Sequence, residues 1–207
     1  MHCQEVERRF TVSKKKIKYI TLSQIIAMFL IVLSHSFSKR IEQPPNTMYY
    51  VSVIQGIGLT LFMFISGFLF EKTEQMSKYS IGKIIKKRAI RLLIPYVVIQ
   101  IIMYIPKYIM ASYSNIPVEL SMEFIIKSFL NPRSGILPHL WFLPVLFVIT
   151  CIVVMVYPLF RNNKMLILIT SIISVLTIIK FDKHVIAGID DIVHYLFWFL
   201  FGICFVR

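Results

Sequence analysis

The sequence predicts an all-α fold, a polytopic membrane helical bundle of about six transmembrane helices with both termini in the cytosol. Three observations predict it. First, 57% of the 207 residues are hydrophobic, which is too apolar for a water-soluble domain. Second, long runs of the chain carry no charge. Third, the basic residues behind the net charge of +13 gather in short segments between those runs, which is typical of membrane proteins and argues against a nucleic-acid partner.

The first two spans are predicted over Ile20 to Phe37 and over Val51 to Phe70. Twenty uncharged residues at ~1.5 Å each are long enough to cross ~30 Å of hydrocarbon. The basic segment that ends at Lys16 precedes the first span without a small-residue cleavage site, so this span is interpreted as a retained helix. Pro44 and Pro45 predict a turn between the two spans.

A basic segment from Glu71 to Arg91 separates the second span from the third. It holds seven Lys or Arg and two Glu, so its net charge is 7 − 2 = +5, and we expect it in the cytosol. The third span is predicted over Leu92 to Met110, with Pro95 and Pro106 marking a helix start or a kink. We expect the Lys107 side chain to extend outward from the membrane.

The second half of the chain continues the alternation. The electrically neutral connection from Ala111 to Pro138 is expected outside, with a short surface helix around Val118 to Leu130. The fourth span is predicted over Leu140 to Phe160. Two shorter apolar runs, Met165 to Ile179 and Ile192 to Val206, are predicted as the fifth and sixth spans.

Residues 1–207 are therefore expected to form a single membrane domain. No repeat, linker or low-complexity tract divides the sequence. The chain stops directly after the last apolar run, which predicts that these residues belong to a longer protein.

His35 is the first candidate for chemistry, because ionisable groups within membrane spans are costly and often functional. It lies near the outer end of the first span between Ser34 and Ser36, where an imidazole could take a proton from an alcohol at neutral pH. The alternative is a helix-end histidine that only bonds a neighbour. Gln24, eleven residues earlier, shares its helix face and indicates either a polar lumen or a structural contact.

Four cations form a second candidate site, here named the basic stripe. They are Lys83, Lys87, Arg88 and Arg91, which a helix would align along one side. Guanidinium and ammonium groups suit phosphates. The alternative is a cluster that only orients the chain and contacts anionic lipid headgroups.

His139 and His194 are expected at the same membrane depth as His35. His139 enters the fourth span from the outer side, so His35 and His139 could share a site. Three histidines at one depth invite a metal interpretation, but their spacing does not support it. We predict no metal site.

Four stretches together resemble the membrane-bound acyltransferase 3 family, which O-acylates cell-surface sugars in bacteria. They are Ile25 to Ser36, Gly58 to Leu69, Lys86 to Tyr96 and His139 to Leu143. Their order and sidedness are similar to those of the family's opening helix, its SGF helix, its paired-arginine segment and its HLWFL segment. Gln24 departs from the family, which commonly has an arginine at this position. The resemblance covers the N-terminal portion of the family, and implies that further C-terminal helices are missing.

The resemblance implies an O-acyltransferase in the cytoplasmic membrane. Its donor would be cytosolic acyl-coenzyme A, most often acetyl-coenzyme A, and its acceptor a hydroxyl of a cell-surface polysaccharide or a lipid-linked sugar. Lys87, Arg88 and Arg91 would hold the coenzyme's phosphates. His35 would act as base or transient acyl carrier, and His139 would assist the acceptor hydroxyl or the oxyanion. Trp141 could stack on a sugar ring.

Two other functions fit the same residues. A transporter or flippase of a glycan or small anion would use the histidine to relay protons. An inactive, truncated remnant would only pair its helices with other membrane proteins.

Overall fold

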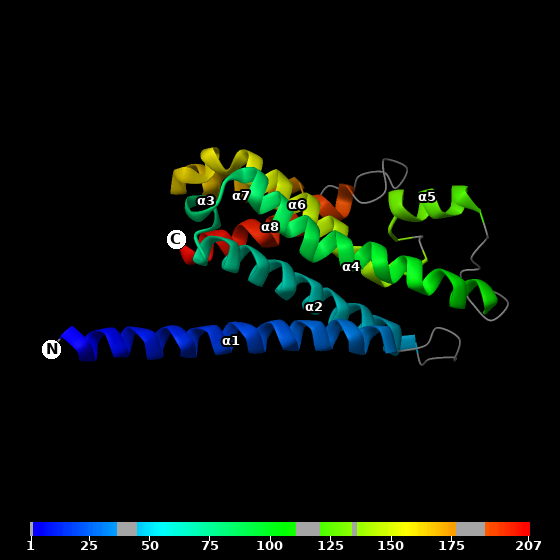
Figure 1. The fold of residues 1–207 in the computed structure, drawn as a ribbon, viewed down its shortest axis with the longest axis horizontal. Coiled ribbons are helices and arrows are strands. Elements are labelled where there is room, and N and C mark those ends of the chain that lie inside the picture. The colour runs from blue at the N-terminus through cyan, green and yellow to red at the C-terminus, as the bar shows by residue number, and fades with distance from the viewer. Residues whose placement is uncertain (1, 37–44, 111–120, 134–135, 177–188) are drawn as a thin grey trace.

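A computed structural model describes residues 2–36, 45–110, 121–133, 136–176 and 189–207 as helices joined by short turns (Figure 1). The α-helices are α1 (His2–Ser36), α2 (Pro45–Lys72), α3 (Gln75–Lys78), α4 (Ile81–Ile109), α5 (Met122–Leu130), α6 (Phe142–Val156), α7 (Asn163–Leu176) and α8 (Ile189–Val206). Two 3₁₀ turns, η2 (Pro138–Leu140) and η3 (Tyr157–Arg161), flank α6. The described residues contain no strand, so the predicted all-α class is confirmed.

The first four predicted spans are confirmed as helices long and apolar enough to cross a membrane. They cover Tyr19–Ser36, Asn46–Lys72, Ile81–Ile109 and Pro138–Leu159. The fifth predicted span corresponds to α7, whose apolar part is shorter, and the sixth to α8, with 18 residues. Both termini lie at the same end of the molecule (Figure 1). The count of six spans and the cytosolic side of the termini stay predictions.

α4 differs from its predicted form. It begins at Ile81, after Ser80 with an extended backbone, and includes both prolines in its interior. Of the two alternatives for Pro95, the helix start is wrong, because α4 already begins at Ile81 and the Lys and Arg residues before Pro95 are good helix formers. Membrane helices also tolerate an interior proline. Consequently the basic stripe lies on the same continuous helix as the third span.

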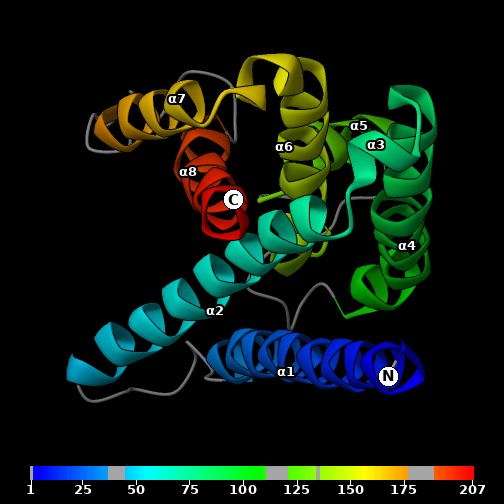
Figure 2. The same ribbon diagram turned by 90° about the vertical axis from the view of Figure 1, so that its left-hand side faces the viewer.

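α2 and α8 form the most extensive helix–helix contact among the described elements, and Figure 2 shows the C-terminal end of α8 beside the C-terminal half of α2. A Cβ atom added to Gly67 would overlap the carbonyl oxygen of Phe199, and one added to Gly202 would overlap that of Phe64. Small residues let membrane helices approach closely enough for backbone-to-backbone packing. A Cβ atom added to Gly58 of α2 would lie 3.1 Å from the carbonyl oxygen of Ala27. Gly58 therefore lets α2 approach α1 closely.

Apolar side chains also cover the outside of the bundle. Ile25 and Phe29 of α1 and Ile101 and Ile105 of α4 are exposed. An apolar exterior of this extent suits lipid rather than water. The short helix predicted around Val118 to Leu130 is confirmed from Met122 onward as α5, and residues 118–120 lie outside the described part.

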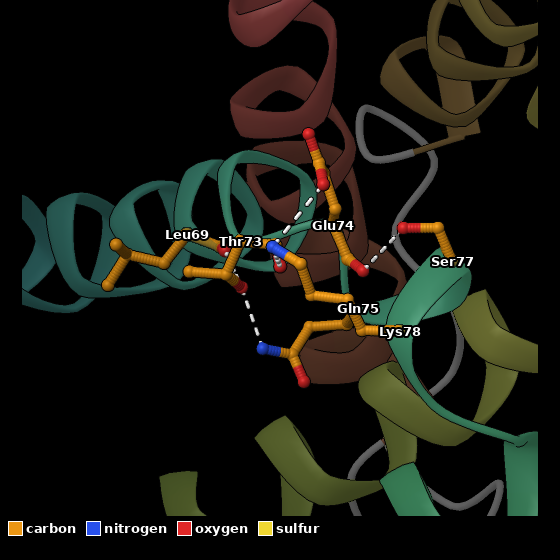
Figure 3. Close-up of polar contacts among 6 residues, drawn as sticks. All are labelled: Leu69, Thr73, Glu74, Gln75, Ser77 and Lys78. Carbon is orange, nitrogen blue, oxygen red and sulfur yellow. Dashed lines mark hydrogen bonds and ion pairs between the residues drawn. The ribbon is translucent and has the colours of Figure 1, made fainter. Parts of the chain in front are cut away.

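A tight turn joins α2 to α3 and then to α4 (Figure 3). Glu74 has a left-handed backbone with φ 51°, a conformation that costs an L-residue ~1 to 2 kcal/mol. Three contacts hold it: Thr73 Oγ1 donates to the Leu69 oxygen at 2.6 Å, Ser77 Oγ donates to the Glu74 oxygen at 3.0 Å, and Lys78 pairs with the Glu74 carboxylate at 3.3 Å. The turn thereby sets where the basic stripe begins.

Candidate active site

His35 and His139 lie against each other, and we call them the histidine pair. His35 is in the last turn of α1 and His139 is in η2, which leads into α6. Their ring centroids are 4.6 Å apart with an angle of 51° between the ring planes. Both residues are exposed. The prediction that these histidines come together is confirmed, and their catalytic roles stay predictions.

The two serines beside His35 are engaged by their own helix. Ser34 Oγ donates to the Ile31 oxygen and Ser36 Oγ to the Leu33 oxygen, each at 2.7 Å. Such bonds to the preceding turn are common for helical serines. Among residues 34–36, the imidazole is therefore the group suited to receive a proton.

The segment before His139 is held by two side chains of α4. The Leu137 N–H donates to Gln100 Oε1 at 3.0 Å, and Lys107 Nζ donates to the Ile136 oxygen at 2.6 Å. Lys107 thereby reaches a carbonyl oxygen in the connection that we expect outside, and the outward extension of its side chain from the membrane stays a prediction. Sequence reasoning missed Gln100, although a lone amide in an apolar run was a signal for it.

Trp141, two residues after His139, is enclosed. Only 6% of it is exposed, the Arg133 guanidinium lies 4.0 Å from the ring centroid, and the Tyr195 ring lies 5.6 Å away. Asp191 of α8 accepts two hydrogen bonds from Arg133, at 2.7 and 2.5 Å. Because Arg133 and Tyr195 already contact the indole, the predicted stacking of Trp141 on a sugar ring is wrong for this structure.

His194 has a different neighbour from the histidine pair. Its ring packs edge-on against Tyr195, with 4.9 Å between the ring centroids. In the part of the chain that the structure describes, no group of three or more His, Cys, Asp or Glu side chains is arranged to hold a metal ion.

The basic stripe lies in the first turns of α4, at the end of the bundle opposite the histidine pair (Figure 1). Lys87 and Arg91 are exposed and Arg88 is half-buried. The ammonium groups of Lys83 and Lys87 lie 5.1 and 4.9 Å from the centroid of the Tyr79 ring, within the range of cation–π attraction. Exposed, multiply charged donors of this kind can bind a phosphate or pyrophosphate.

A second polar network near the same end joins three elements. Arg207 donates to Glu71 at 2.6 Å and to the Tyr157 hydroxyl at 3.1 Å, and that hydroxyl donates to Glu71 at 3.1 Å. Burial lowers the pKa of Arg207, but the hydrogen bond and charge of Glu71 outweigh burial and raise it. The network ties the end of α2 to the start of η3 and to Arg207, directly after α8.

Comparison with known proteins adds one match. A family model described as an acyltransferase domain matches residues 17–207, which include the histidine pair and the basic stripe. No curated protein and no solved structure matches the chain.

Proposed function

Since the chain belongs to the acyltransferase 3 family, we propose that it moves an acyl group, most often acetyl, from acyl-coenzyme A to a hydroxyl of a cell-surface glycan or glycolipid. The family and the four long apolar helices indicate a membrane acyltransferase. The donor, the acceptor and the cytoplasmic membrane as the location are part of the proposal.

The observation that carries the proposal is the pairing of His35 with His139, 4.6 Å between ring centroids, at one end of a bundle whose opposite end carries the basic stripe. An imidazole is suited to general-base work near neutral pH, whereas the cations suit phosphates. This separation supports a reaction in which the donor is held at one end and the acyl group is used at the other.

In the simplest route His35 acts as a general base. It takes the proton of the acceptor hydroxyl while the hydroxyl oxygen attacks the thioester carbonyl carbon. The tetrahedral intermediate collapses as the carbon–sulfur bond breaks, and the leaving thiolate takes the proton from the His35 imidazolium. The products are an ester and free coenzyme A. His139, beside His35, would donate a hydrogen bond to the developing oxyanion.

A covalent route uses the same residues. A nitrogen of the His35 imidazole attacks the thioester carbonyl and the carbon–sulfur bond breaks. The leaving thiolate takes the proton from the other imidazole nitrogen, which leaves a neutral acyl-imidazole and free coenzyme A. The acceptor hydroxyl then attacks that acyl group while His139 takes its proton, and the carbon–nitrogen bond breaks as the proton passes from His139 to the leaving His35 nitrogen. Both routes place the donor phosphates on Lys87, Arg88 and Arg91 of the basic stripe, and neither uses a metal.

To test the proposal, membranes that contain the protein are incubated with acetyl-labelled acetyl-coenzyme A. The label that mild base releases from glycan is then measured. His35→Ala should lower the transfer rate by ~10² to 10⁴-fold while the protein still inserts. Ser36→Ala is the matched control, because Ser36 bonds only its own helix among the contacts above, and it should transfer at the native rate.

Two results would contradict the proposal. A fully active His35→Ala protein would remove His35 from the chemistry. Glycan that crosses the membrane without gaining a base-labile label would instead support a transporter.

A further inference from the structure

We propose that Gln100 and Lys107 of α4 are positioning residues that hold His139 against His35. The inference rests on the proposed function for its catalytic meaning, but the contacts that carry it are independent of any substrate. Both side chains bind backbone groups within three residues of His139.

The two side chains lie on one face of α4. They are seven residues apart, about 20° short of two full helical turns. Gln100 is almost completely buried, with 1% exposed, and Lys107 is half-buried. The backbone groups that they bind belong to adjacent residues, Ile136 and Leu137. The two side chains therefore converge on one point of the segment.

That point is where the chain changes direction into η2. Leu137 has φ −125° and ψ 85°, and the 3₁₀ turn begins at the next residue. The Leu137 N–H and the Ile136 carbonyl precede the turn, and Ile136 is 2% exposed, so water does not readily replace a lost partner. A buried backbone group without its partner would shift the segment rather than stay unbonded.

Charge is a second reason to assign Lys107 a role. A charged lysine near the end of an apolar helix costs free energy, and its side chain usually lowers that cost by extending toward the lipid headgroups. Here the ammonium also donates to a backbone carbonyl 29 residues away along the chain. That carbonyl belongs to Ile136, three residues before His139, whose ring lies against that of His35. The cation is therefore part of the surroundings of the histidine pair.

The first arm of the test measures the distance between the two histidine positions without relying on activity. The three native cysteines are replaced by alanine, His35 and His139 are replaced by cysteine, and a short bifunctional thiol reagent crosslinks them in membranes. Gln100→Leu or Lys107→Met should slow crosslinking several-fold. Lys107→Arg, which keeps a charged donor, should crosslink close to the parent rate. Tyr157→Phe, which weakens a polar network at the opposite end, should crosslink at the parent rate.

The second arm measures acyl transfer with His35 and His139 intact. Gln100→Leu and Lys107→Met should lower kcat about 10- to 10²-fold, the usual range for a misplaced catalytic group, and leave the KM for acetyl-coenzyme A unchanged. Tyr157→Phe should leave both constants unchanged. A purely structural role would instead lower the amount of folded protein without changing kcat per folded molecule.

Crosslinking at the parent rate in Gln100→Leu and Lys107→Met would overturn the positioning role, whatever the activity. Equal losses in Lys107→Arg and Lys107→Met would overturn the role of the Lys107 charge. If crosslinking responds as expected while the unaltered protein transfers no acyl group, the proposed function fails and the positioning of His139 stands.

Discussion

The two polar ends of this bundle are built differently. Near the histidine pair, hydrogen bonds connect different elements. Gln100 and Lys107 of α4 bind the backbone before η2, and Arg133 pairs with Asp191 of α8. In the basic stripe all four cations come from one helix, and Lys83 and Lys87 gather around a single ring, Tyr79.

The difference matches the two tasks that we propose. Transfer of an acyl group depends on placing reacting atoms within fractions of an ångström, so its groups need rigid supports. Binding a flexible, multiply charged phosphate ester tolerates movement of long side chains, because charge attraction is not strongly directional. Disturbing each end should therefore change a different kinetic constant.

The largest effect on stability is expected at the interface between α2 and α8. Gly67→Val would push a side chain into the backbone of α8 at Phe199, and we expect a loss of about 3 kcal/mol or more in stability from overpacking. Thermal unfolding of the detergent-solubilised protein measures the loss. Binding of acetyl-coenzyme A and acyl transfer should then fall together, as folded protein is lost.

Gly82→Ala is the matched control for Gly67→Val, because a Cβ added at Gly82 has no heavy atom within 4 Å. It should unfold at or slightly above the native temperature, since alanine favours a helix. Equal unfolding temperatures for Gly67→Val and the native protein would show that α2 and α8 do not pack as described.

A smaller and selective effect is expected in the basic stripe. Arg91→Gln should raise the KM for acetyl-coenzyme A about tenfold, the equivalent of ~1.5 kcal/mol for one charged hydrogen bond, and leave kcat unchanged. Initial rates over a range of donor concentration measure both constants. Because Arg91 is exposed, added salt should reduce the difference between variant and native protein. A fall in kcat with an unchanged KM would break the proposed division between the ends.

The smallest effect is expected at Tyr79. Tyr79→Leu removes the ring near Lys83 and Lys87, and each cation–π contact at an exposed site contributes ~0.5 to 1 kcal/mol. The KM for acetyl-coenzyme A should rise a few-fold, whereas Tyr79→Phe, which keeps an aromatic face, should match the native value. Identical constants for Tyr79→Leu and the native protein would mean that the ring does not organise the lysines for binding.

The success of sequence reasoning differed between these regions for a physical reason. The first four spans were predictable because a long uncharged run has few stable alternatives to a membrane helix. The meeting of His35 and His139 followed from topology alone, since both sit where a span reaches the same side. The third span was predicted to begin only at Leu92, because the residues before it are charged, although the helix extends back to Ile81 and contains Pro95.

The sequence by itself determined the all-α membrane class, the candidate histidines and the candidate cations, because hydrophobicity, charge and helical spacing are local properties of the chain. Only the tertiary structure decided that Trp141 is enclosed and that Lys107 and Gln100 hold the approach to His139. Those contacts join α4 and α8 to residues of the segment between α5 and α6. Their existence depends on how closely the helices pack, which glycines such as Gly67 and Gly202 permit and which no single stretch of sequence reveals.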